Sequence, residues 1–363
     1  TVVLSGNNTL TGSATVNTGA TLVAASNNAL GGTTGATTVN SGGTLGLQGG
    51  ITIPAAESIT ISGNGVGGTI GALRNVSGDN TVSGNITLAA SSSIGSAAGT
   101  GTLTGVISGT GFSLTKVGTG DIVLGGTSAN TYTGGTTVSA GTLTLNKTAG
   151  LDATGSSGTI TVNSTGTVAL GADNQINDSI TLALNGGTFR TNNNSDTLGN
   201  LSLLATSSIN FSNGDSSVLT FTNAARTAGT LNIDDWNGIP TVGGGGSQLV
   251  FTNAGTGFGA SDIAFTGFGS GWTRLGTGEI VPIVTGGASY TWNVNAAGAL
   301  NTAGNWTVNS GSFLANGAAN DTAIFGNGLL SAARAVDATG GRTLGYLAFS
   351  GSSGNNFTIN NST

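Results

Sequence analysis

The sequence predicts an all-β protein of the β-solenoid class, in which short strands stack as successive coils of about 20–25 residues. Three observations predict this fold. Thr, Val, Ile and Leu alternate with small polar residues in short runs, as in half-buried strands. Gly- and Asn-rich turns too short to hold a helix separate these runs. The runs recur at a nearly constant spacing, and each is too small to bury its own apolar face, so stacked neighbours must cover it.

The composition excludes several other classes of protein. The 363 residues include 67 Gly, 3 Pro and no Cys, Met or His, and only 6% are charged. Gly without a strict third-residue period argues against collagen, and regularly recurring apolar residues argue against disorder. Without Cys and His there are no disulfides, thiol nucleophiles, Ser-His triads or typical zinc sites. A net charge of −6 without a basic stripe predicts no nucleic-acid partner.

Nothing in the sequence indicates a transmembrane segment. No apolar run approaches the ~20 residues that a bilayer-spanning helix needs. The sequence shows neither a start Met nor a signal-peptide pattern, so we expect a mature chain or one excised from a longer protein.

The clearest unit of the chain is the stretch Gly111–Leu145. It contains three predicted strands, at Ser113–Lys116, Asp121–Leu124 and Thr136–Leu145. The turns between them cover Val117–Gly120 and Gly125–Gly135. Gly supplies the corners that need a positive φ.

This unit is repeated within the chain. Thr9–Leu47 matches Thr131–Leu170, and with the residues before them the two copies span 3–47 and 123–170. A shorter period lies beneath the repeat, and we place strand centres near Val16, Val39, Ile61, Val82, Ile107, Val138, Val162, Leu182 and Leu203. A fixed period in this range is typical of a solenoid.

Two domains are expected. Residues 1–287 form the solenoid module, of which 213–287 are a looser closing segment, and Gly286-Gly287 is the boundary. Residues 288–363 are richer in aromatic residues and are expected to begin a following module. Its predicted strands are Ala323–Phe325, Thr343–Phe349 and Asn356–Ile359.

The repeat unit resembles a known family. The motif runs Leu114-Thr-Lys-Val-Gly-Thr-Gly, then Asn130-Thr-Tyr-Thr-Gly-Gly-Thr-Thr-Val, then Gly141-Thr-Leu. It resembles the autotransporter-associated β-strand repeat, also called the passenger-associated transport repeat. The residues that carry the resemblance are Leu114, Lys116, Gly118, Gly120, Asn130, Tyr132, Gly134, Val138, Gly141 and Leu143. The resemblance implies a right-handed parallel β-helix, an extracellular or bacterial cell-surface location, a long parent protein and no enzymatic activity.

One stretch offers a possible glycan contact. Asp234 and Asp235 are the only adjacent acids, and Trp236 follows them with a ring that could stack on a sugar. The alternative is a turn whose Trp packs on the solenoid. Adjacent strand residues point to opposite faces, which disfavours a joint acid/base role for the two carboxylates. We therefore expect no catalytic residues.

Bound cofactors are not expected, with calcium as an open alternative. Oxygen-rich turns occur at Asn192–Asp196, Asn213–Asp215 and Asp173-Asn174. None has the spacing of an EF-hand or of the Gly-rich calcium nonapeptide, so Asx turns are the simpler interpretation. For Lys116, a solvated or capping side chain is expected in preference to a covalent Lys–Asn crosslink.

The resulting hypothesis is a structural one. The chain is expected to be a segment or subunit of a long surface fibre or filament, in which tandem copies or head-to-tail self-association extend the stack. Two alternatives are kept: an adhesin-type module that binds cell-surface glycans, and a carbohydrate-active β-helix enzyme. Nucleic acid is not an expected partner.

Overall fold

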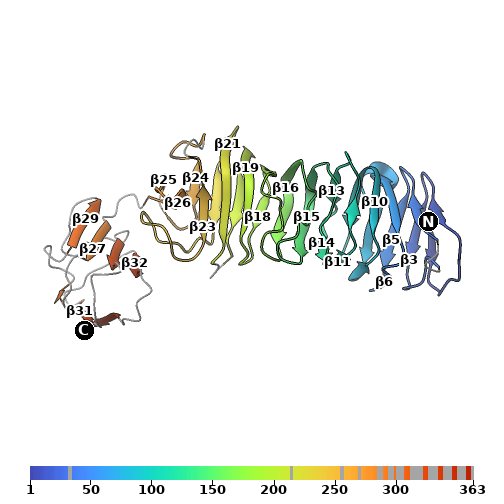
Figure 1. Ribbon diagram of the computed structural model, residues 1–363, viewed down its shortest axis with the longest axis horizontal. Helices are drawn as coiled ribbons and strands as arrows, with labels where there is room; N and C mark the ends of the chain where they lie inside the picture. Colours follow the sequence, from blue (N-terminus) through green and yellow to red (C-terminus); the bar gives the residue numbers. More distant parts are fainter. Residues whose placement is uncertain are drawn as a thin grey trace.

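The computed structural model describes residues 1–283, apart from 32–34, 213–215, 254–256 and 269–270, and beyond them the strands between residues 289 and 360. Residues 1–283 form an elongated rod, and the chain winds along it from one end to the other (Figure 1). The described part is almost entirely β, with a single 3-10 turn at Val66–Gly68. None of its helices is long and apolar enough to cross a membrane. The predicted β-solenoid is therefore confirmed.

Each coil of the rod has three sides, and strands on the same side of successive coils pair in parallel to form a column. The first column begins with β2 (Ala14–Val16), β4 (Thr37–Val39), β7 (Ile59–Gly63), the first half of β10 (Ile86–Ser96) and β12 (Ile107–Ser108). It resumes with the first halves of β19 (Asp196–Ala205) and β21 (Val218–Arg226), followed by β23 (Gln248–Phe251). Between β12 and β19 the coils are joined by loop hydrogen bonds, such as Ala153 N to Gln175 O.

The second and third columns are more regular. The second contains β1 (Val2–Leu4), β3 (Thr21–Ala24), β5 (Thr44–Gln48), β8 (Leu73–Ser77), the second half of β10, β13 (Leu114–Val117), the first halves of β15 (Thr136–Lys147) and β16 (Thr159–Leu170), β17 (Thr181–Asn185) and the second halves of β19 and β21. The third contains β6 (Thr52–Ile53), β9 (Asn80–Val82), β11 (Thr100–Leu103), β14 (Asp121–Gly126), the second halves of β15 and β16, β18 (Thr188–Arg190), β20 (Ser207–Asn210), β22 (Leu231–Asp234) and β24 (Ile263–Phe265).

The core is a set of apolar ladders inside these columns. Leu103 pairs with Leu124, Leu124 with Leu145, and Leu145 with Leu170, and all four side chains are buried. Neighbouring strand residues point alternately into this core and out to solvent, which explains the alternation in the sequence. The apolar surface that one coil cannot bury is covered by the coils on either side.

The strand centres inferred from the sequence fall on different columns. Val16, Val39 and Ile61 lie in the first, Val138, Val162, Leu182 and Leu203 in the second, and Val82 in the third. The coil length of about 20–25 residues holds for most rungs, such as Val16 to Val39 and Leu124 to Leu145. It rises near the C-terminal end of the rod, where Ile233 pairs with Phe265, because longer loops are inserted there.

The rod ends in an antiparallel hairpin, and different sheets follow. The hairpin consists of β25 (Trp272–Arg274) and β26 (Glu279–Pro282). The later strands are β27 (Ser289–Trp292), β28 (Gly298–Ala299), β29 (Trp306–Ser310), β30 (Thr322–Phe325), β31 (Arg334–Asp337), β32 (Tyr346–Phe349) and β33 (Phe357–Asn360). Among the described strands these seven pair only with one another, in sheets of four and three. Gly286-Gly287 lies outside the described residues, and the division into modules stays a prediction.

The ladder arrangement makes a testable distinction within one strand. Leu143 is buried in the third column, whereas Thr144 beside it points outward. We expect Leu143→Ala to lower the free energy of unfolding by about 2–5 kcal/mol, because it leaves a cavity between two coils. Thr144→Ala is expected to change it by less than ~0.5 kcal/mol. Chemical denaturation followed by circular dichroism measures both, and equal losses would contradict the assigned core.

Candidate functional site

The stretch Gly111–Leu145, which has the strongest motif, folds as expected. Its three predicted strands are β13, β14 and the greater part of β15, with ends shifted by one or two residues. β15 continues through a corner at Gly141, where φ is +66°, and thereby supplies a strand to two columns. Leu114, Val138 and Leu143 are core residues on these strands.

Lys116 is the first chemically distinctive residue of this stretch, and it is not solvated. Only 1% of its surface is exposed, and Nζ donates to Val117 O (3.1 Å), Gly118 O (2.8 Å) and Ala140 O (2.9 Å). Burial lowers its pKa to about 8, while nearby Asp121 acts in the opposite direction. Of the two roles that the sequence left open, a solvated or a capping lysine, the structure shows capping: the ammonium group caps carbonyl oxygens of two successive coils.

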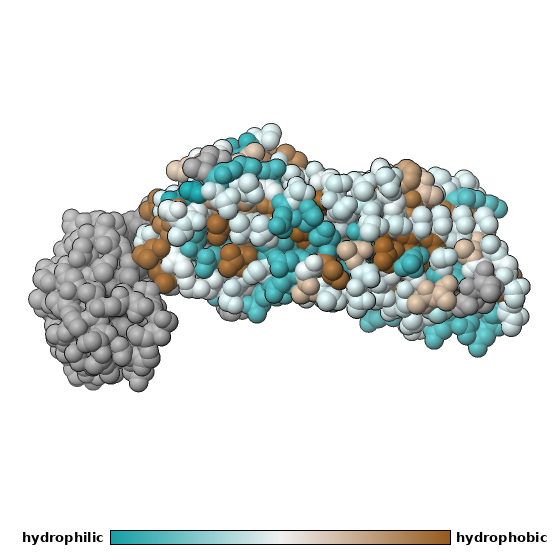
Figure 2. All heavy atoms as spheres, in the orientation of Figure 1, coloured by the Kyte–Doolittle hydropathy of each residue, from teal (hydrophilic) through white to brown (hydrophobic). Residues whose placement is uncertain are grey.

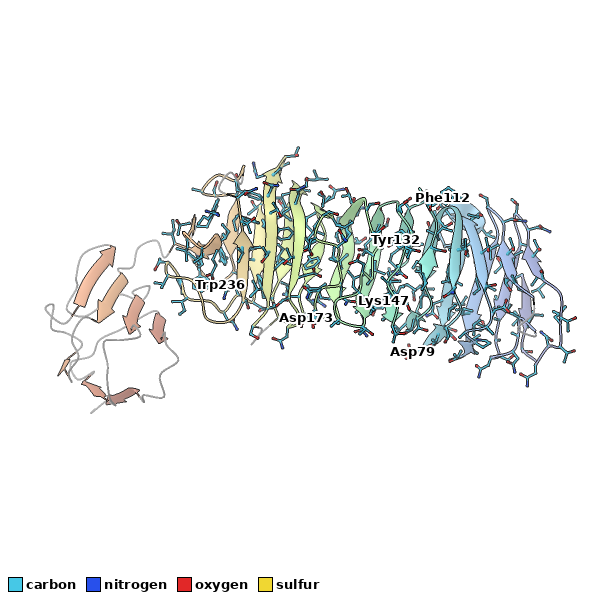
Figure 3. All side chains as sticks on the ribbon, viewed as in Figure 1. Asp79, Phe112, Tyr132, Lys147, Asp173 and Trp236 are labelled. Atoms are coloured by element: carbon cyan, nitrogen blue, oxygen red, sulfur yellow. The ribbon has the colours of Figure 1, made fainter. Side chains whose placement is uncertain are left out.

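A second buried lysine, Lys147, was missed by the sequence analysis. Its Nζ donates to Gly125 O at 2.7 Å and more weakly to Gly105 O at 3.4 Å, and burial lowers its pKa to about 8. These are the only two lysines of the chain, and both lie within the rod (Figure 3 labels Lys147). The alternation of strand residues could have identified both lysines as buried. Residues two apart on a strand point to the same face, and Lys116 is two residues from buried Leu114, as Lys147 is from buried Leu145.

Asn130 and Tyr132 fix the chain where the first column has no strand. Asn130 Oδ1 accepts from Ile107 N (2.8 Å) in the preceding coil, and its Nδ2 donates to Ala153 O (2.6 Å) in the following coil. The Asn side chain thus supplements, in both directions, the backbone bonds from Thr131 N to Ile107 O and from Asn130 N to Asp152 O. Tyr132 is fully buried beside it, and its hydroxyl shares a 2.6 Å hydrogen bond with Thr136 Oγ1. Burial raises the pKa of Tyr132 to about 12.

The motif glycines allow successive coils to approach closely. A Cβ on Gly134 would lie 2.3 Å from Phe112 O, and one on Gly141 would lie 2.6 Å from Gly120 O and 2.8 Å from Lys116 Nζ. Gly118 and Gly120 are similarly close to Ser96. These glycines therefore have a steric role in the stack, together with the positive φ of Gly118 and Gly141.

The buried acids also serve the backbone. Asp196 Oδ2 accepts from Gln175 N (2.9 Å) and Ile176 N (3.2 Å), and Oδ1 accepts from Thr197 N (2.9 Å). Burial raises the pKa of Asp196 to about 7, against the effect of these hydrogen bonds. Glu57 accepts from Thr37 Oγ1 at 2.6 Å. Asp178 also acts to raise the pKa of Asp152 and of Asp196, but burial is the largest cause of both shifts.

The turns considered for calcium have a similar role where they are described. Asp173 Oδ1 accepts from Ser195 N (2.7 Å), and Asn192 and Asn193 adopt positive φ values of 48° and 61°. The positive φ values of Asn192 and Asn193 are typical of Asx-type turns, whereas the Asp173 contact joins two successive coils. Within the described residues, no group of three or more acidic side chains could hold a metal ion. The turn Asn213–Asp215 lies outside the described residues.

Trp236, the possible glycan contact, is an interior residue. It is 6% exposed and packs edge-on against Phe265 (ring centroids 5.1 Å apart) and Phe268 (5.5 Å), near the C-terminal end of the rod (Figure 3). A sugar ring has no free indole face to stack on here, so the structure favours the packing alternative. Asp234 and Asp235 do not act as a pair: Asp234 accepts from Thr266 Oγ1, and Asp235 accepts from Asn210 Nδ2.

Comparison with known proteins agrees with this geometry. The model of the passenger-associated-transport-repeat family matches residues 1–24 and 114–145. The chain carries passenger-associated transport repeats. No curated protein and no solved structure matches the chain. The second match covers the buried Lys116, Asn130 and Tyr132, so the residues that define the repeat are those that hold adjacent coils together.

The two copies of the passenger-associated transport repeat lie on different sides of the rod. Val16 belongs to the first column, whereas its counterpart Val138 lies in the second column, with Lys116 and Ile94. The repeat therefore specifies a strand, a glycine corner and a further strand, and it does not specify a fixed side of the coil.

The repeat glycines give a matched pair of variants. We expect Gly134→Ala to lower the free energy of unfolding by about 1–3 kcal/mol, because the new methyl group overlaps Phe112 O. At the corresponding position of the first copy, Gly12, a Cβ meets nothing within 4 Å. Gly12→Ala is the control and should be nearly neutral in thermal unfolding; an equal loss in both variants would argue against the steric role.

The buried lysines predict a pH dependence of stability. Because the pKa of Lys116 falls from about 10.5 unfolded to about 8 folded, the unfolded chain binds more protons between pH 8 and 10. The free energy of unfolding should rise with pH over this window, with Lys147 contributing in the same direction. Lys116→Met should reduce the rise, and should lower stability at pH 7 because three carbonyls lose their donor. Urea titrations at several pH values test this; Arg190→Met, at an exposed site, should leave the rise unchanged.

Proposed function

We propose that this chain is a rod-forming segment of an extracellular β-solenoid of the passenger type, and that its role is mechanical. The observation that carries the proposal is the parallel ladder of Figure 1, which runs along the rod with an apolar core and without clustered chemistry among the described residues. Along a solenoid, each added coil adds about 4.8 Å of length, so about eleven rungs correspond to a rod of roughly 50 Å.

Several features support an exposed, protease-rich setting for this rod. The repeat belongs to the passenger-associated family, and the chain has no Cys whose oxidation state would matter. Both lysines are buried, which removes two cleavage sites for trypsin-like proteases. Figure 2 shows residues of near-neutral hydropathy over much of one face, with hydrophilic and apolar patches between them.

Extension of the rod is part of the proposal. At the N-terminal end Val2 and Leu10 are exposed, although Ile122 and Tyr132, at the corresponding positions of the second copy, are buried. A further coil, from a tandem stretch of the same polypeptide or from a second copy, would bury these side chains and pair with β1. No described feature favours the adhesin or the enzyme alternative.

The proposal is tested with the purified chain. Small-angle X-ray scattering should give the profile of a rod of constant cross-section, and limited trypsin digestion should leave residues 75–190 as one resistant fragment, because both lysines between Arg74 and Arg190 are buried. Incubation with acidic and neutral polysaccharides should release no oligosaccharides. Antibody labelling of intact producing cells should place the chain outside. Polysaccharide cleavage or an exclusively internal location would overturn the proposed function.

A further inference from the structure

The C-terminal end of the rod is built differently from the rest. Every pairing between two of the described strands from β1 to β24 is parallel, whereas β26 crosses the outer edge of β23 antiparallel, with Leu249 opposite Ile280 and Val250 opposite Glu279. β25 then pairs antiparallel with β26. The edge of the first column, where a further coil would add, is therefore already occupied.

This hairpin satisfies the backbone groups that β23 would otherwise expose. Phe251 N donates to Gly278 O (2.9 Å). Arg274 donates hydrogen bonds to the carbonyl groups at this edge, from Nε to Phe251 O (2.9 Å) and from Nη2 to Thr252 O (2.8 Å). A guanidinium group cannot accept a hydrogen bond, so it ends the ladder where a strand would continue it.

Side chains anchor the hairpin over the core. Ile280 and Val281 are fully buried. Glu279 Oε2 accepts from Gly244 N (2.8 Å) in the glycine-rich loop of residues 241–246. Thr241 N in the same loop donates to Pro282 O (3.2 Å). The loop and the hairpin therefore close the end together.

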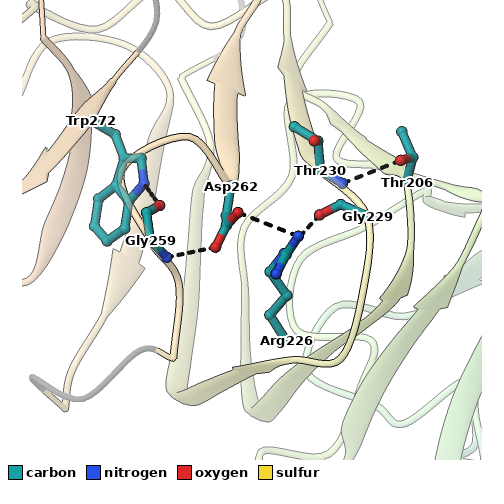
Figure 4. Close-up of polar contacts among 7 residues, drawn as sticks. All are labelled: Thr206, Arg226, Gly229, Thr230, Gly259, Asp262 and Trp272. Carbon is teal, nitrogen blue, oxygen red and sulfur yellow. Dashed lines mark hydrogen bonds and ion pairs between the residues drawn. The ribbon is translucent and has the colours of Figure 1, made fainter.

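A second set of contacts joins the hairpin to the preceding coils (Figure 4). Trp272 Nε1 donates to Gly259 O (2.9 Å), and Gly259 N donates to Asp262 Oδ2 (2.6 Å). Asp262 Oδ1 pairs with Arg226 at 3.3 Å, and Arg226 Nε donates to Gly229 O (2.7 Å). This chain of contacts runs from β25 to the loops beside β21 and β22.

We propose that the β25–β26 hairpin is an autoinhibitory cap, which keeps the edge of β23 from pairing with a second copy of this chain. The expected partner follows from the geometry, because this edge accepts an antiparallel strand. Two identical edges related by a two-fold axis meet antiparallel, so opened copies join tail to tail through β23. The cap thus makes the two ends of the rod unequal: the first column can be extended by a parallel strand only at its N-terminal end.

The cap is tested by opening it in the full chain. Ile280→Asp places a carboxylate at a fully buried position opposite Leu249, which should expel β26. Light scattering after gel filtration should change from the monomer mass of 34.8 kDa to about twice that value. Ile283→Asp is the matched control, since Ile283 follows the same strand but is exposed, and it should stay monomeric.

Spin labels identify the interface. The chain has no Cys, so single cysteines can be placed at Thr220, on β21 next to β23, and at Thr15, at the other end. In the Ile280→Asp variant, labels at Thr220 should lie close together across the dimer, and labels at Thr15 should not. A synthetic peptide of residues 271–283, added in excess, should compete for the edge and restore the monomer.

Several outcomes would overturn the proposal. One is an Ile280→Asp variant that is folded but monomeric. Another is a wild-type chain that already dimerises with the Thr220 labels close together. A third is an Ile280→Asp variant that associates without bringing the Thr220 labels close together. If Ile280→Asp does not fold, Arg274→Ala decides, because it frees only Phe251 O and Thr252 O. The Arg274→Ala variant should then dimerise at raised protein concentration with the Thr220 labels close together. A variant that stays monomeric would overturn the proposal.

Discussion

The axial ladder of backbone hydrogen bonds is the constraint on which the other features of this rod depend. In a solenoid, a coil can satisfy its N–H and C=O groups only through the coils before and after it. The coils must therefore approach closely at every corner, and Gly134 and Gly141 stand where a Cβ would overlap the neighbouring backbone. The same requirement explains why a chain so rich in glycine can be ordered: the conformational freedom of glycine is offset by contacts that a larger residue would prevent.

The buried polar residues are a second consequence of this ladder. Where a side of the coil has no strand, its backbone groups still need partners, and Asn130 provides one to each neighbour. Where a corner turns carbonyl oxygens inward, Lys116 and Lys147 supply the donors. Asp196 does the reverse and accepts from backbone N–H groups. Residues that resemble catalytic groups by type thus act as replacements for missing backbone partners.

The sequence was sufficient for the class of fold and insufficient for the roles of its charged residues. Alternation in Thr136–Leu145 and the spacing from Val16 to Val39 reflect burial on a repeating lattice, so strands and coils could be predicted from them. That each coil has three sides was hidden, because the side that contains Asn130 has no strand pattern at that coil. For Trp236 and Lys116 the sequence left a surface position and a packed or capping one open, because their positions depend on neighbours about one coil away, such as Phe265 and Ala140, which local sequence does not identify.

The positions of the two repeats show what the repeated sequence specifies. Val16 and Val138 are 122 residues apart, and at about 23 residues per coil this is five coils and roughly a third of another. Equivalent motifs therefore occur on different sides of the rod, and outward residues of the two copies do not line up along one face. A binding surface built by repetition would require them to align. The steric requirements of the glycine corner and of the core therefore account for the similarity of the two copies. The coil length sets which side of the rod each copy occupies. This arrangement agrees with the proposed mechanical role, since the ladder continues whichever side the motif occupies.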